Sequence, residues 1–142
     1  MFSKEESKRL KQDFWIAFGK SFPRKWTLYN TKIKGLIFKF QFDLKSAQVA
    51  IIVDHNNLEV RMELWEKLMS LKNIIKEEYL PNAKFNDSYL VNNNKEISKI
   101  YVEIKNVSIH DKNTWRETMV FLFNNMNKVE DFFLEYKDII EV

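Results

Sequence analysis

Two runs of alternating apolar residues between positions 36 and 53 constrain the fold of this chain more than any other feature. The apolar residues of the two runs are Leu36, Phe38, Phe40 and Phe42, followed by Ala47, Val49, Ile51 and Val53. Side chains two residues apart on a strand point to the same face, so each run predicts a strand with one apolar face. A turn at residues 43–46 pairs Phe42 with Ala47 and Leu36 with Val53, and a slip of one residue would separate the two apolar faces. The sequence therefore predicts an antiparallel hairpin of defined register.

A second hairpin is predicted at residues 83–91 and 97–107, around a turn at residues 92–95. The predicted partners are Val91 with Glu96, Leu90 with Ile97, Ser88 with Lys99, Asn86 with Tyr101 and Lys84 with Glu103. Ile100, Val102 and Ile104 alternate with polar residues, which is typical of a strand with one face in solvent. This register places Lys99 and Tyr101 on the solvent face and Asp87 on the opposite face.

A helix and a short strand are predicted before the first hairpin. Ser3 and Glu6 have the spacing of a capping box, and apolar residues at helical spacing continue from there to Gly19. We therefore expect a helix over residues 4–19. Residues 26–29, with the sequence Trp-Thr-Leu-Tyr, have the β-branched and aromatic content of a short strand.

Two more helices are predicted downstream. Asn56 or Asn57 caps the first, which ends just before Pro81 because the residue before a proline disfavours helical backbone. Asp111 opens the last helix, and its apolar residues recur in steps of four and three: Trp115, Met119, Leu122, Met126, Val129, Phe133 and Tyr136. Additional phenylalanines widen this stripe, which favours packing against the domain's own sheet over a coiled coil between two copies.

The predicted order is helix, strand, hairpin, helix, hairpin, helix. This order is typical of the α+β class, here with helices packed on an antiparallel sheet of about five strands. The chain has 142 residues, which is enough for one substantial core, and no linker or low-complexity segment divides it. We expect a single domain over residues 1–142.

Composition excludes several classes of function. The chain has no cysteine, which excludes a thiolate metal site and a cysteine nucleophile and fits a reducing compartment. It has two glycines, too few for a glycine-rich phosphate-binding loop. Residues 1–8 are charged where a signal peptide is apolar, and every apolar run is far shorter than the roughly 18 residues of a membrane span. We expect a cytoplasmic protein without a membrane segment, a metal or a cofactor.

Two histidines lie beside aspartates at predicted strand-to-helix junctions. An aspartate next to His55 or His110 would be able to orient the imidazole for base or metal chemistry. Asp and Asn also favour helix starts through capping alone. We interpret both histidines as structural.

One segment has a marked charge asymmetry. Residues 14–42 contain no acidic residue and six cations, which are Lys20, Arg24, Lys25, Lys32, Lys34 and Lys39. Cations neutralise phosphates and exposed rings stack on bases, so these six residues are candidates for binding a nucleic acid or an acidic protein. The alternative is that the interleaved aromatic residues belong to the core and the cations are only solvated, or paired with the acidic C-terminal residues.

Glu103 and Lys105 form the strongest enzymatic signal. They have the Glu-x-Lys spacing of restriction-endonuclease-like nucleases, in which two carboxylates hold Mg²⁺ and the lysine stabilises charge on the phosphate. Any alternating strand with a solvent face often contains this spacing. The predicted register places no second acid beside Glu103, so we expect an ion pair with Lys84 there and no metal site.

Several aromatic and apolar spacings are similar to those of a known family. They are Phe14-Trp15, Trp26, Lys34-Gly35-Leu36, the predicted helical residues 68–77, Ser98-Lys99-Ile100 and Trp115. Together they resemble the domain of unknown function 4268 family over nearly the whole chain. In longer members the module looks like a C-terminal appendage to a nuclease-like region. The resemblance implies an association with nucleic-acid or restriction and defence systems, and it supplies no catalytic residues.

Three functional hypotheses follow from the sequence. The first is a non-catalytic binding module that holds a protein or a nucleic acid through the basic segment. The second is a small metal-dependent nuclease that uses Glu103 and Lys105. The third is a structural homodimer formed through the C-terminal helix.

Overall fold

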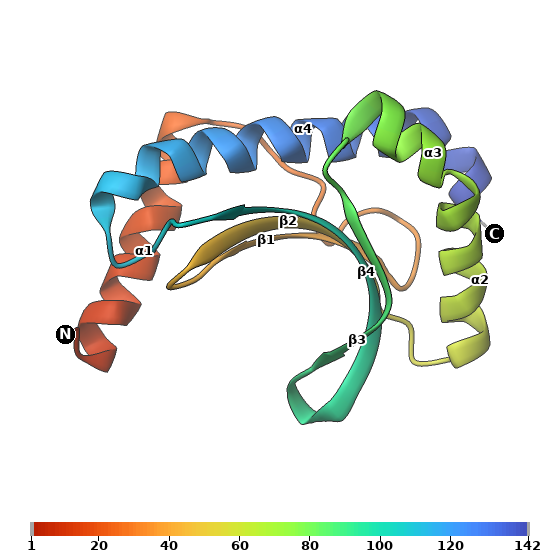
Figure 1. Cartoon of the computed structure of the whole chain (residues 1–142), viewed down its shortest axis with the longest axis horizontal. Helices are drawn as coiled ribbons and strands as arrows, with labels where there is room; N and C mark the ends of the chain where they lie inside the picture. Colours follow the sequence, from red (N-terminus) through yellow and green to blue (C-terminus); the bar gives the residue numbers. More distant parts are fainter. Residues whose placement is uncertain (1, 142) are drawn as a thin grey trace.

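The computed structural model describes residues 2–141, except for the side chain of Asn93, and it has an α+β architecture (Figure 1). The main elements are α1 (Lys4–Ser21), β1 (Leu36–Phe42), β2 (Ser46–Val53), α2 (Leu58–Ser70), α3 (Lys72–Ile74), β3 (Lys84–Val91), β4 (Lys95–Lys105) and α4 (Trp115–Ile140). A π-helical turn, Ile75–Tyr79, and two 3-10 turns, Asn92–Asn94 and Lys112–Thr114, lie between them. The predicted α+β class is confirmed, but the single antiparallel sheet has four strands, in the order β1, β2, β4, β3, instead of about five.

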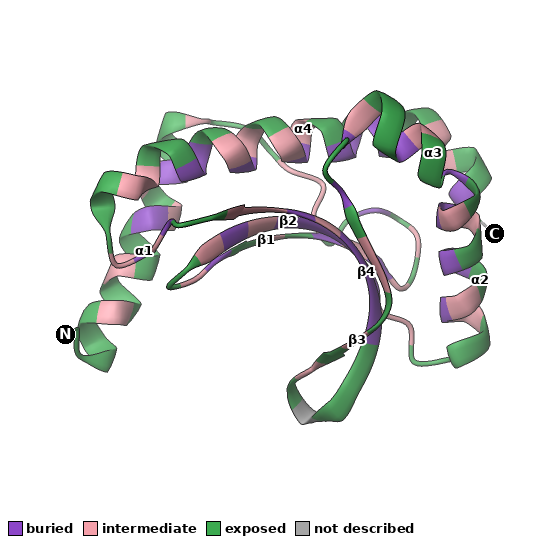
Figure 2. Ribbon diagram, viewed as in Figure 1, coloured by how far each residue is buried: buried purple, intermediate pink, exposed green. Residues whose placement is uncertain are grey.

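The sheet is arched, and the helices follow its convex side (Figure 1). Buried residues of α1, α2 and α4 line the sides of these helices that face the sheet (Figure 2). The main core joins Phe14 of α1, Phe38 of β1, Leu64 of α2 and Leu122 of α4. A separate small apolar cluster, with Ala50, Ile52 and Ile97 buried in it, lies on the other face of the sheet. We call this second, concave face the open face.

The first hairpin has the predicted register. Leu36 pairs with Val53 and Phe42 with Ala47, and the apolar sides of both strands face the helices. In the turn, the Asp43 carboxylate accepts hydrogen bonds from the backbone N–H groups of Lys45 and Ser46, both at 3.0 Å. The prediction was correct because the apolar face of each strand packs against the main core, which permits a single register.

The predicted strand at residues 26–29 is absent, and residues 22–35 form a loop. Leu28 has a φ of +39°, a left-handed conformation that interrupts an extended strand. The Leu28 carbonyl accepts a single hydrogen bond from β1, which the backbone N–H of Phe38 donates at 2.9 Å. The Trp26 ring packs instead against Phe40 and Phe123, so the aromatic residues of this segment contribute to core packing and not to a strand.

The predicted helix boundaries at the N-terminus and before Pro81 need small corrections. The capping box of Ser3 and Glu6 is present, but α1 continues through Gly19 to Ser21. The second helix ends before Pro81 as predicted, yet it is divided into α2, α3 and the π-helical turn after a break at Leu71. No helix within residues 2–141 is long and apolar enough to cross a membrane.

The predicted register of the second hairpin is wrong. A three-residue turn, in which Asn94 has a φ of +59°, pairs Val91 with Lys95 and Tyr89 with Ile97. An irregularity at residues 87–88 then shifts the pairing again, so Asn86 pairs with Lys99 and Lys84 with Tyr101. After both shifts, Lys84 and Asn86 lie on the face that the sequence predicted for them, whereas Tyr89 lies on the open face and not on the predicted one. The hairpin tip therefore contributes a ring that the sequence prediction placed on the opposite side.

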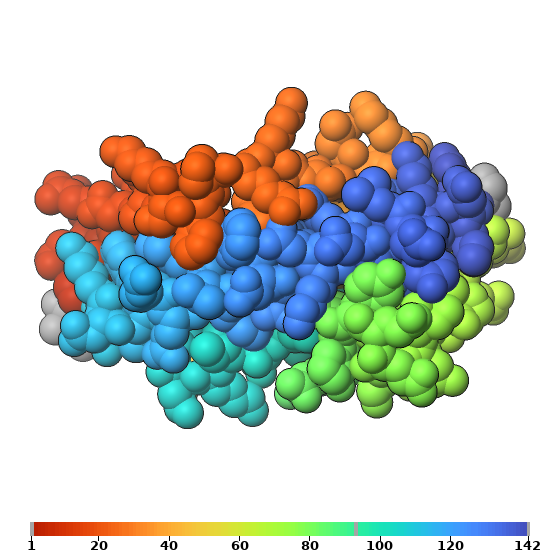
Figure 3. Space-filling view, turned by 90° about the horizontal axis from the view of Figure 1, so that it is seen from above, coloured from red at the N-terminus to blue at the C-terminus, as the bar shows by residue number. Residues whose placement is uncertain are grey.

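The apolar stripe of α4 packs into the domain's own core, as predicted. Leu122, Met126 and Val129 are completely buried, and Met119 is nearly so. Seen from above, α4 lies between the loop of residues 22–35 and the segment around the π-helical turn (Figure 3). The large apolar residues of α4 that are exposed are Val120, Leu134 and Ile139, so a homodimer through α4 would have to use these residues and not the stripe.

Candidate functional site

The open face carries three rows of side chains that cross the sheet. The rows, read from the strand pairings, are Lys39, Ala50, Tyr101 and Lys84; then Ile37, Ile52, Lys99 and Asn86; and finally Gln41, Gln48 and Glu103. Each row contains residues that are direct neighbours on adjacent strands, so their side chains point to the same side of the sheet. The open face thus combines lysines, a tyrosine and an apolar floor.

A hollow of about 750 Å³ lies on this face. It extends from Phe42 and Asp43 at the turn of the first hairpin to residues 90–92 at the tip of the second. Its volume is in the range of ligand-binding clefts, which are typically about 300 to 1,000 Å³. Lys11 of α1, Lys39 of β1 and Lys99 of β4 contribute its cations.

Lys99 is the most unusual residue of the hollow, because it is only 4% exposed. The sequence prediction placed it in solvent, but the tyrosines beside it cover it: its Nζ lies 4.2 Å from the ring centroid of Tyr89 and 4.6 Å from that of Tyr101. No ion pair in residues 2–141 includes Lys99. Burial lowers the pKa of Lys99, a shift that Glu103 opposes and Lys39 reinforces. Lys99 is thus a buried cation that is held by aromatic rings and not by a carboxylate.

The two acids that line the hollow have other partners. Asp54 Oδ1 lies 2.8 Å from the Nζ of Lys95, and the Asp43 carboxylate accepts the backbone hydrogen bonds of its turn. Lys11 and Lys39 are exposed. The hollow therefore presents an excess of positive charge to an incoming ligand.

The predicted basic segment is divided among several places in the fold. Lys39 lies on the open face, whereas Lys32 and Lys34 line a smaller depression beside His55 and Glu63. Lys20 is exposed in the last turn of α1, and Lys25 is exposed in the loop of residues 22–35. Of the six predicted cations, Lys39 is the one that lines the hollow.

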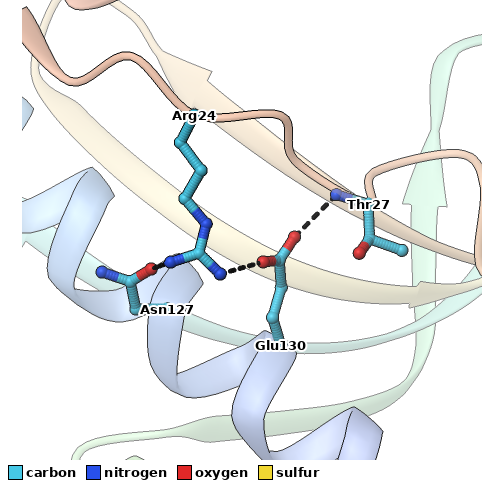
Figure 4. Close-up of polar contacts among 4 residues, drawn as sticks. All are labelled: Arg24, Thr27, Asn127 and Glu130. Carbon is cyan, nitrogen blue, oxygen red and sulfur yellow. Dashed lines mark hydrogen bonds and ion pairs between the residues drawn. The ribbon is translucent and has the colours of Figure 1, made fainter.

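Arg24 has a structural contact with α4 (Figure 4). Its guanidinium donates to Glu130 Oε1 at 2.6 Å and to the Asn127 side chain, and it lies 4.7 Å from the Trp26 ring centroid. The other Glu130 oxygen accepts the Thr27 N–H at 2.6 Å. Glu130 is buried, so these contacts hold the loop of residues 22–35 against α4. The guanidinium is consequently engaged within the domain.

Glu103 has a glutamine and a lysine as its polar partners. The Glu103 carboxylate accepts a hydrogen bond from Gln48 Nε2 at 2.8 Å and lies 3.9 Å from Lys84 Nζ. The predicted ion pair with Lys84 is confirmed, although it is diagonal and Glu103 is largely buried. Lys105 is exposed at the end of β4. Nowhere in residues 2–141 do three His, Cys, Asp or Glu side chains group closely enough to hold a metal ion.

Both histidines make local structural contacts. His55 Nδ1 accepts the backbone N–H of Asn57 at 3.0 Å, next to the helix cap of α2. The His55 side chain lies so close to Gly35, which has a φ of +89°, that a Cβ on residue 35 would be 2.9 Å from the Cβ of His55 and 3.0 Å from its ring. His110 Nε2 forms a hydrogen bond of 2.9 Å with the Ser7 hydroxyl of α1. These contacts agree with the structural interpretation of both residues.

Of the six candidate binding residues predicted from the sequence, Lys39 lines the hollow, and the other residues that line it were not among the candidates. The sequence prediction placed Lys84, Lys99 and Tyr101 on one face, and that part of the prediction was correct. The missing information was the arch of the sheet and the shift of Tyr89, which turn a solvated face into a hollow. An available signal was the Lys-x-Tyr spacing of Lys99 and Tyr101 on a strand whose other face is apolar.

Comparisons with known proteins gave one match. The family model described as "Domain of unknown function (DUF4268)" matches residues 10–137. Searches of the curated proteins and of the solved structures gave no match. The match covers every strand of the sheet, residues 10–21 of α1 and residues 115–137 of α4.

Proposed function

The chain belongs to the DUF4268 family, and we propose that this member is a non-catalytic binding module that holds an anionic partner on the open face of its sheet. The observation that carries the proposal is Lys99, which is buried in the hollow without a carboxylate partner. The partner is a nucleic acid or an acidic protein of the cytoplasm. The family resemblance to modules attached to nuclease-like regions is consistent with a partner in nucleic-acid or defence systems.

Burying Lys99 in the absence of a ligand costs free energy. Removing an ammonium from water is unfavourable unless a counter-charge or hydrogen bonds compensate for the loss of hydration. The rings of Tyr89 and Tyr101 supply part of that compensation through cation–π attraction. An anion that entered the hollow would supply the remainder, and it would also meet Lys39 and Lys11. A residue that destabilises the free domain is expected where it contributes to binding.

A titration with inorganic polyphosphate tests this function, because polyphosphate carries charge without bases or side chains. We expect binding to weaken as the salt concentration rises. We expect Lys99→Met and Lys39→Met each to remove one phosphate contact, which makes the slope of log affinity against log salt shallower by about 1. Lys25→Met is the matched control, since Lys25 is an exposed lysine of the same basic segment that does not line the hollow. The proposal is wrong if Lys25→Met weakens binding as much as Lys99→Met, or if the wild-type protein does not bind.

A further inference from the structure

The row of Lys39, Ala50, Tyr101 and Lys84 crosses all four strands of the open face. Neighbouring strands are about 4.8 Å apart, so the backbones of the two lysines at the edges are separated by roughly 14 Å. Lys99 lies in the adjacent row on the same strand as Tyr101. The cations are therefore distributed across the width of the sheet and are not gathered at one point.

This distribution favours a chain of anions over a single small anion. One phosphate or carboxylate would reach both edge lysines only if their side chains extended toward each other, whereas Lys84 Nζ lies 3.9 Å from Glu103 on the β3–β4 side of the sheet. A polyanion that crosses the strands would meet Lys39, Lys99 and Lys84 in succession. The charge pattern thus selects an extended ligand.

The centre of the row is suited to a flat apolar group. Ala50, the smallest side chain of the row, is the direct neighbour of Tyr101 and lines the hollow. The Tyr101 ring is half-buried, with Lys99 Nζ at 4.6 Å and Lys84 Nζ at 6.0 Å from its centroid. If these two ammonium groups move to ligand phosphates, a face of the ring becomes available. Ile37 and Ile52 continue the apolar floor in the adjacent row.

An extended polyanion that alternates charge with flat aromatic groups is a single-stranded nucleic acid. Aromatic side chains stack on unpaired bases whatever the sequence, and lysines follow the backbone. A duplex shows its phosphates but keeps its bases stacked on one another, and an acidic peptide carries charge without flat rings at every residue. The combined charge and ring pattern of the open face therefore fits a single strand better than either of these.

We propose that the open face binds single-stranded nucleic acid that crosses the sheet along this row, with phosphates at Lys39, Lys99 and Lys84 and one base stacked on Tyr101 over Ala50. The inference rests on the proposed function, namely that the open face holds an anionic partner. It adds the class of the partner, the direction of the strand across the sheet and the residue that contacts a base.

Fluorescence anisotropy with a short labelled thymidylate oligonucleotide tests the inference. Unlabelled oligonucleotide, duplex DNA, inorganic polyphosphate and polyglutamate are the competitors. We expect the single strand to compete best. We expect Tyr101→Leu to weaken its binding roughly tenfold or more, the loss typical of one stacked base, and Tyr101→Phe to retain binding because the ring remains. Tyr136→Leu, a half-buried tyrosine of α4 on the convex side, is the matched control and should bind as the wild type does.

Ultraviolet crosslinking of a bromouridine-containing single strand to the wild-type protein gives a result that does not depend on the folding of a variant. We expect the crosslinked peptide to contain Tyr101 or Tyr89, and crosslinks confined to α4 or to residues 22–35 would overturn the inference. Equal or better competition by polyphosphate, polyglutamate or duplex, with Tyr101→Leu unchanged, would also overturn it while leaving an anion-binding open face. Failure of every polyanion to bind would overturn the proposed function together with the inference.

Discussion

Lysines are almost never fully buried unless they are paired, and Lys99, which is 4% exposed, lies between two tyrosine rings. Its lysine neighbours on the open face, Lys39 and Lys84, belong to the two edge strands. In the free domain the hollow therefore contains unbalanced positive charge. At the scale of the residue, the account predicts that Lys99 reduces stability and that a bound anion restores it.

A stability measurement against pH tests this claim about Lys99. Burial lowers its folded-state pKa below the usual value of 10.5, so the unfolded chain binds the proton more tightly than the folded one. The destabilising contribution of Lys99 to the free energy of unfolding consequently becomes smaller as pH increases toward 10.5. We expect Lys99→Met to raise the free energy of unfolding at pH 7, and we expect this gain over the wild type to shrink as pH rises toward 10. A gain that does not change with pH, or a loss at pH 7, would contradict the account.

At the scale of the elements, the loop of residues 22–35 depends on a polar contact with α4. Both oxygens of the buried Glu130 carboxylate are occupied, one by Arg24 and one by the Thr27 backbone (Figure 4). Removing Arg24 would leave a buried carboxylate with only a backbone donor. These contacts, and not β-pairing, position the aromatic residues of the loop against the sheet.

The contact predicts a specific loss of stability. We expect Arg24→Ala to lower the free energy of unfolding by about 2 kcal/mol, below the usual cost of breaking a fully buried pair because the Arg24 side chain is 38% exposed. Lys25→Ala, at the exposed neighbour, should change it by less than about 0.5 kcal/mol. Urea denaturation of the two variants and the wild type measures both values. Equal effects of the two substitutions would show that the Glu130 contact contributes little.

The elements also show how much of the fold was predictable. The first hairpin and the stripe of α4 were predicted correctly because packing of one side against the main core enforces a strict period. The second hairpin has a weaker pattern, and its register depends on the left-handed Asn94 and on the irregularity at residues 87–88. The strand at residues 26–29 was wrong because tertiary packing of Trp26 and the turn at Leu28 overrode local propensity.

The candidate site was also predictable only in part from the sequence. Lys84, Lys99 and Tyr101 were assigned to one face from alternation alone, and the structure agrees. The burial of Lys99 beside a hollow could not be predicted, because it arises from the arch of the whole sheet and the shift that brings Tyr89 to this face. Charge clustering along the chain pointed to residues 14–42, yet the cations of the open face come from α1, β1, β3 and β4.

At the scale of the whole molecule, the two faces of the sheet have different roles. The convex face is covered by α1, α2 and α4 and contains the main core (Figures 1 and 2). The concave face carries a small apolar cluster, lysines and tyrosines around a hollow. Most of the contacts that stabilise the domain therefore lie on the convex side of the sheet, and the concave side is available for a ligand.

Amide chemical-shift mapping by NMR on addition of inorganic polyphosphate tests whether the open face holds an anion, since it reports on every part of the domain at once. The account predicts that the largest shifts fall on β1, β2 and β4 and on the tip of the second hairpin, around Lys39, Lys99 and Tyr89. The loop around Arg24 and the helix α4 should shift little. Largest shifts at Lys20, Lys25 and α4, with the open face unchanged, would contradict it.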